Sequence, residues 1–95
     1  MRIRNYPLAV RFFNNLIEED PNFAEAWNKR ATVYFMMGNF DKSMLDIIKT
    51  LELEPRHFGA LDGMGLIFIH QGQFQQAIDV YDKMLEIFPF SVKTM

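Results

Sequence analysis

Three prolines, Pro21, Pro55 and Pro89, stand thirty-four residues apart. Similar side chains recur at the same offset: Ala26 and Ala60, Tyr34 and Phe68, Gly38 and Gly72, and the trio Tyr6, Phe40 and Phe74. A fixed period of this size is typical of architectures in which one small structural unit stacks on the next. We therefore expect an array of repeated units, in which each unit buries its apolar face mainly against its neighbours.

Each unit is predicted to form two helices. Apolar side chains spaced i, i+3, i+4 and i+7 mark one face of a helix, as Trp27, Ala31 and Tyr34 do. The second helices carry the sets Phe40, Met44, Ile47, Ile48 and Leu51, and Phe74, Ala77, Ile78, Tyr81 and Leu85.

Glycine and proline are predicted to set the helix ends. Gly38 and Gly72 should end the first helices, because a left-handed terminal residue favours glycine. Pro55 and Pro89 should close the second helices, since proline disfavours helical geometry in the residue before it. The small residues Ala31 and Gly65 are expected where the two helices of a pair cross closely.

These marks resemble the tetratricopeptide repeat. Its pattern is matched by Trp27, Ala31, Tyr34, Gly38, Phe40, Ser43 and Pro55 in one unit, and by Leu61, Gly65, Phe68, Gly72, Phe74, Ala77 and Pro89 in the next. The resemblance implies an all-α solenoid of antiparallel helix pairs with a right-handed superhelix. The segments AEAWNKRAT and LEPRHFGAL are similar to a bacterial subgroup. Three departures are Arg30, where a Leu is expected, Thr50, where a small apolar residue is expected, and Arg4, where a turn glycine is expected.

The period divides the chain unevenly. We expect one domain over 1–95, in which 1–21 hold the second helix of an incomplete repeat, 22–55 and 56–89 are repeats, and 90–95 start a further helix. The chain is then either a fragment of a longer array or a module that self-associates through uncapped ends. The residues expected to lack cover are Phe12, Phe13, Leu16 and Ile17 at one end and Ile78, Tyr81, Leu85 and Phe88 at the other.

Composition excludes several classes of function. The absence of cysteine removes disulfides and thiolate chemistry, and a net charge of −2 argues against nucleic acid as a partner. No apolar run reaches the roughly 18 residues that a membrane span needs. The two histidines have no acid at a metal or triad spacing, and no Gly-rich phosphate loop occurs. The sequence therefore predicts no enzyme, no cofactor and no metal site; Asp62 and His70 form at most a weak metal pair.

The resemblance implies a protein or peptide partner, bound on a concave face lined mainly by the first helix of each pair. The positions that correspond to this face are Asn28, Thr32, Phe35, Met36, Asp62, Leu66, Ile69 and His70. An exposed apolar strip usually marks a partner site, and Phe35, Met36, Leu66 and Ile69 are expected to form one. The same residues would instead be buried if copies of the chain packed together.

The character of this face suggests what it would bind. The chaperone-binding subset of the family holds a terminal carboxylate with Lys and Asn side chains, and Asn28 and Thr32 replace two of them here while Asp62 adds a repelling charge. We expect a peptide with a positive or polar group near Asp62 and an apolar side chain near Leu66 and Ile69.

The role of the basic residues is open to two interpretations at each of three places in the chain. Arg30 lies on an apolar face, where it is expected to stack on an aromatic ring or pair with Glu54 or Asp46. Arg56 and His57 lie in a turn and serve either recognition or the carbonyls of the preceding helix. Residues 1–17 resemble a transit peptide in their arginines, although their register favours a repeat helix. The cytoplasm is favoured, with an upstream signal left open.

Overall fold

Five helices make up the protein in a computed structural model that describes residues 5–88. They are α1 (Tyr6–Glu19), α2 (Ala24–Met36), α3 (Phe40–Leu53), α4 (Phe58–His70) and α5 (Phe74–Ile87). No strand occurs in this range, which confirms the predicted all-α class. Helices α2 and α3 fall within 22–55, and α4 and α5 within 56–89. The further helix expected at 90–95 lies outside the described residues.

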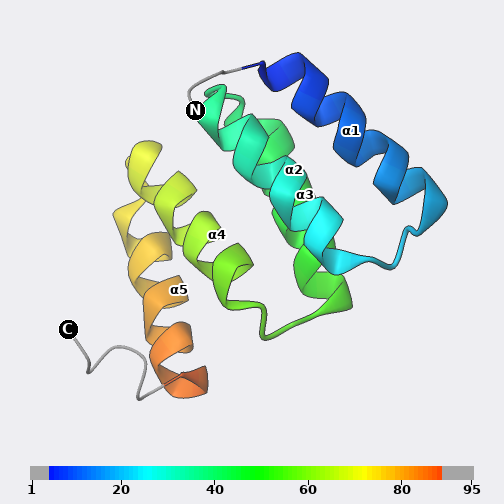
Figure 1. Cartoon of the computed structure of the whole chain (residues 1–95). Coiled ribbons are helices and arrows are strands. Elements are labelled where there is room, and N and C mark those ends of the chain that lie inside the picture. The colour runs from blue at the N-terminus through cyan, green and yellow to red at the C-terminus, as the bar shows by residue number, and fades with distance from the viewer. Residues whose placement is uncertain (1–4, 89–95) are drawn as a thin grey trace.

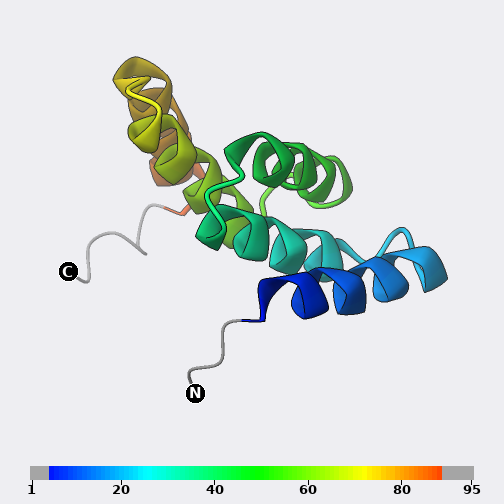
Figure 2. The same ribbon diagram turned by 90° about the horizontal axis from the view of Figure 1, so that it is seen from above.

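Neighbouring helices run antiparallel and stack in sequence order (Figure 1). Helix α2 packs on α3 and α4 on α5, while α1 lies along α2 and α3 contacts α4. Figure 2 shows α1 flanking the α2–α3 pair, with the α4–α5 pair turned away beyond it. In residues 5–88 no helix combines the length and the hydrophobicity that crossing a membrane requires.

The two predicted glycine turns are confirmed. Gly38 and Gly72 have φ of +80° and +76°, in the left-handed region. After α2, the N–H of Gly38 donates to the carbonyl of Phe35 at 2.9 Å, and the N–H of Asn39 donates to that of Tyr34 at 2.9 Å. This pair of bonds is the Schellman arrangement, which satisfies the last carbonyls of a helix. The same bonds recur around Gly72, so both repeats turn in the same way.

The core lies where the small residues allow helices to approach. Ala31, Ile47, Ala60 and Ile67 form its centre, and Phe35, Phe40, Met44, Leu51 and Met64 pack against it. The carbonyl of Ala31 accepts a bond from Ser43 Oγ at 2.7 Å. A Cβ atom on Gly65 would lie 2.6 Å from Cζ of Tyr81, which is closer than packed atoms approach. The predicted close crossings at Ala31 and Gly65 are therefore confirmed.

Arg30 joins three helices. Its Nε and Nη2 donate to Oδ2 and Oδ1 of Asp46, both at 2.8 Å, and its Nη1 donates to Asn14 Oδ1 at 2.7 Å. Its guanidinium carbon also lies 5.1 Å from the centre of the Trp27 ring. The bond to Asp46 raises the pKa of Arg30, against the opposing effect of burial. Both predicted roles are thus present, with Asp46 rather than Glu54 as the partner.

Some apolar side chains at the two ends of the array are exposed to solvent, as expected. Phe12 is 57% exposed at one end, and Ile78 and Leu85 are also exposed at the other. The expectation was wrong for Ile17, which is only 8% exposed. The reason is that α1 packs along α2 and Ile17 lies on the packed side. Phe88 is half-buried because its ring meets that of Phe58, with centroids 5.2 Å apart.

Candidate partner-binding site

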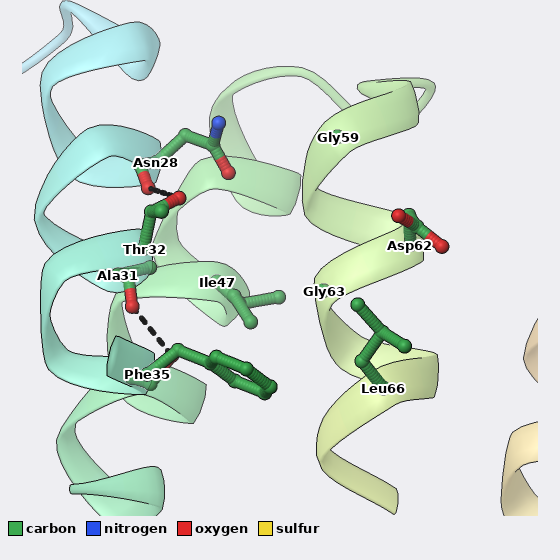
Figure 3. Close-up of a pocket in the computed structure, with 10 residues that line it drawn as sticks. Asn28, Ala31, Thr32, Phe35, Ile47, Gly59, Asp62, Gly63 and Leu66 are labelled. Atoms are coloured by element: carbon green, nitrogen blue, oxygen red, sulfur yellow. Dashed lines mark hydrogen bonds between the residues drawn. The ribbon is translucent and has the colours of Figure 1, made fainter. Parts of the chain in front are cut away.

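A cavity of about 220 Å³ lies between α2 and α4. Figure 3 shows these helices as its two walls, with α3 behind them. The ten lining residues are Asn28, Ala31, Thr32 and Phe35 from α2, Ser43 and Ile47 from α3, and Gly59, Asp62, Gly63 and Leu66 from α4.

Two glycines of α4 let this helix lie close to its neighbours at the cavity. A Cβ on Gly63 would lie 3.2 Å from Ile47 Cδ1, and one on Gly59 would lie 3.4 Å from Asn28 Nδ2. The α4 wall therefore presents bare backbone toward α3 and α2 at these two positions. Glycine inside a helix costs up to about 1 kcal/mol relative to alanine. That local cost is the signal in the sequence from which these two positions could have been singled out.

Five of the eight predicted binding residues line this cavity: Asn28, Thr32, Phe35, Asp62 and Leu66. The other three do not line it. Met36 and Ile69 are exposed beside it, one on each wall helix. The His70 ring rests edge-on against Phe35, with centroids 5.2 Å apart, and also lies 5.4 Å from the Phe40 ring.

Phe35 corrects the predicted apolar strip. It is half-buried, packs against the core and lies 5.3 Å from the Phe40 ring, so it belongs to the core as much as to the surface. The expectation of an exposed side chain there was wrong, because the end of α4 brings His70 over it. The exposed members of the strip are Met36, Leu66 and Ile69.

The polar groups of the cavity are mostly hydrogen-bond acceptors. Thr32 Oγ donates its proton to the carbonyl of Asn28 at 3.1 Å, which leaves its lone pairs available. Asp62 Oδ1 accepts a bond from the Tyr81 hydroxyl at 3.2 Å. Burial, and then the charge and hydrogen bond of Asp62, raise the pKa of Tyr81. Within residues 5–88, no basic side chain forms an ion pair with Asp62.

His57 links the starts of the two wall helices. Its Nδ1 accepts the N–H of Ala60 at 3.0 Å and so caps α4, while its Nε2 lies 3.0 Å from Glu25 Oε1. An imidazole that accepts at Nδ1 carries its proton on Nε2, which then donates to the carboxylate. His57 is therefore structural in this arrangement. In the described part of the chain, no three potential ligands come together as a metal site.

Comparison with known proteins agrees with this architecture. A family model described as Tetratricopeptide repeat matches residues 12–44, and a second with the same description matches residues 60–91. A TPR repeat-containing protein of Rhizobium etli is 46% identical over 83 residues, which are 87% of this chain and 41% of the relative. The chain belongs to the tetratricopeptide repeat family. Repeats of this family are generally protein–protein interaction modules.

Further similarities place this tetratricopeptide repeat chain beside larger proteins. The crystal structure of MamA matches with a TM-score of 0.85 and 26% identity, over 93% of this chain and 52% of that one. Hsp70-Hsp90 organizing protein 2 of Arabidopsis thaliana is 28% identical over 87% of this chain and 14% of its own length. The chain spans less than half the length of these curated relatives.

Proposed function

We propose that the chain is a non-catalytic module that binds a peptide or protein segment across α2 and α4, the concave face that the family resemblance implies. One observation carries the proposal. Residues predicted for this face on α2 and on α4 line one cavity, and exposed apolar side chains lie beside it. The proposed contact residues are Asn28, Thr32, Phe35, Met36, Asp62, Leu66, Ile69 and His70.

The composition of the site favours a polypeptide partner. An apolar cavity rimmed by a few polar groups suits an extended segment whose side chains alternate in character. Asp62 is the one charged residue among the ten that line the cavity, which disfavours the phosphate backbone of a nucleic acid. The Arabidopsis relative is named as an organizing protein for Hsp70 and Hsp90. That name supports a role in binding other proteins.

A displayed library of random peptides tests the proposal. The protein is compared with a Leu66→Ser/Ile69→Ser variant, which removes two exposed apolar side chains from α4. The matched control is Leu45→Ser/Ile48→Ser, because this pair has the same residue types and spacing and is also exposed, but does not line the cavity. We expect the α4 variant to lose the selected peptides and the α3 variant to keep them. Equal binding by all three proteins would contradict the proposal.

A second candidate function is self-association through the ends of the array. Leu8 and Phe12 are exposed on α1, where they line an apolar hollow with Asn5, Ala9 and Phe13. Phe74, Ile78 and Leu85 are exposed on α5. Burying a large apolar side chain stabilises a contact by about 1.5–3 kcal/mol, so head-to-tail stacking of two copies would be favourable.

Sedimentation velocity over a range of concentrations separates the two functions. If the ends associate, the mean mass rises with concentration, and Phe12→Gln abolishes the rise. If the mass stays at that of a monomer at every concentration, the proposed self-association is wrong and only the peptide-binding function remains.

A further inference from the structure

The apolar hollow on α1 lies on a face that is covered in the next repeat. On α3 this face includes Ser43 and Asp46, which are buried because α2 lies over them. On α1 the positions thirty-four residues earlier are Ala9 and Phe12, which line the hollow, and Phe12 is exposed. Within residues 5–88, α1 packs against α2 alone, and Figure 2 shows it at the edge of the array. The hollow therefore lies where a further helix would cover α1 as α2 covers α3.

The contact between α2 and α3 shows how such a cover is held. Ser43 Oγ donates to the carbonyl of Ala31 at 2.7 Å. Arg30, the residue directly before Ala31, donates from Nε and Nη2 to the carboxylate of Asp46, both at 2.8 Å. The covering helix thus sets two adjacent residues on α3. The second is small where the helices approach closely, and the first matches the chemistry of the side chain beneath it.

The next pair of helices has the same arrangement with different chemistry. On α4 the two adjacent positions are Met64 and Gly65, and on α5 Val80 stands where α3 has Asp46. An apolar residue thus replaces the charged one on both helices together. The second position is small again, because the two helices approach closely there.

Phe12 fixes what a helix over α1 must carry. It stands where α3 has Asp46, so the side chain above it must be apolar, because a guanidinium buried there would lack its carboxylate. The residue after it must be small, because it would lie over Ala9, the counterpart of Ser43.

We propose that the open face of α1 binds a helix of another protein, which carries an apolar residue followed directly by Ala or Gly. A second copy of the chain supplies no free helix of this kind from residues 5–88. Its α2 is packed between α1 and α3, and its α4 between α3 and α5. The site is separate from the cavity between α2 and α4, and it competes with self-association for the same face.

A synthetic helix with the sequence of α2, residues 24–36, provides the probe. A lactam bridge between Glu25 and Lys29, which already form an i, i+4 ion pair, keeps it helical. One version retains Arg30 and a second carries Arg30→Met. Fluorescence anisotropy of the labelled helices should show that wild type binds the Met version about tenfold more tightly. The Phe12→Asp variant gives α1 the carboxylate that α3 has in Asp46, so its preference should reverse toward the Arg version.

Two further variants control for the location and the shape of the site. Ile78→Asp introduces the same charge at a similarly exposed apolar position on α5, and it should retain the preference of wild type. Ala9→Leu fills the hollow, so both helices should bind it weakly. Circular dichroism verifies that each variant is folded, and Ala9→Leu decides the matter if Phe12→Asp does not fold.

The outcomes are distinct. A preference that reverses in Phe12→Asp and persists in Ile78→Asp establishes the site. If the Met version does not bind, or if Phe12→Asp keeps the preference of wild type, the inference is wrong. Sedimentation velocity tests the other occupant of this face. A mean mass that rises with protein concentration, and does not fall when the Met version is added, would assign the face to a second copy and overturn the inference.

Discussion

The ion pair between Arg30 and Asp46 should dominate the response of this fold to substitution. Asp46 is 3% exposed, and the Arg30 side chain is 18% exposed. Replacing Asp46 by Val removes two charge-assisted hydrogen bonds and leaves a largely buried guanidinium without its carboxylate. Removing one partner of a buried pair in this way costs about 3–5 kcal/mol. The free energy of unfolding should fall by that amount.

The repeat itself supplies the control for this prediction. Thirty-four residues later, the positions of Arg30 and Asp46 are occupied by Met64 and Val80. The double variant Arg30→Met/Asp46→Val therefore copies a pair that the next repeat already uses. Replacing a buried ion pair by apolar residues of similar size is often neutral, so we expect the double variant to unfold within about 1 kcal/mol of wild type.

Urea unfolding followed by circular dichroism measures all three proteins and the Arg30→Met single variant, which completes a double-mutant cycle. The two singles should each be much less stable than the double, with a coupling of about 2–4 kcal/mol. A loss below about 1 kcal/mol for Asp46→Val, or a double variant no more stable than that single, would refute the reasoning.

Three further outcomes are expected. Gly65→Ala should be about 1–3 kcal/mol less stable than Gly63→Ala in urea unfolding. The reason is that the added methyl group meets the Tyr81 ring at position 65, whereas at position 63 it meets only the end of the Ile47 side chain. Equal stabilities of the two variants would show that the Tyr81 ring moves freely. His57→Ala should lower the free energy of unfolding by about 0.5–2 kcal/mol through loss of the α4 cap, and an unchanged thermal midpoint would contradict this role. The raised pKa of Tyr81 favours its protonated form in the folded state. This contribution to stability is therefore complete below the ordinary pKa of tyrosine and is lost as pH rises through the pKa of the folded state. NMR titration of the ring should show that the pKa of Tyr81 falls toward the ordinary value in Asp62→Asn.

Much of the fold follows from the sequence because it depends on local rules. The thirty-four-residue period, the two left-handed glycines and the residues before proline fix where helices begin and end, whatever the tertiary context. Asp46 was also predictable as one candidate partner of Arg30, since an unpaired guanidinium is almost never fully buried.

The site was less predictable because it depends on how one repeat sits against the next. The family resemblance placed Phe35 on the predicted concave face, but the position of His70 over it decides that it is half-buried. Gly59 and Gly63 are marked in the sequence only by their cost to the helix. That Gly59 lies close to Asn28 of α2, and Gly63 close to Ile47 of α3, emerges only when the two repeats are in place.

The chain has two histidines, and they lie at opposite ends of α4. His57 reaches Glu25 at the start of α2, and His70 rests on Phe35 near its end. The two contacts therefore act as spacers between successive repeats, one at each end of the cavity. Helix α4 also packs along α3, so the interface that sets the angle between the repeats also sets the width of the cavity. The pitch of the solenoid and the size of the cavity between α2 and α4 are therefore one geometric variable.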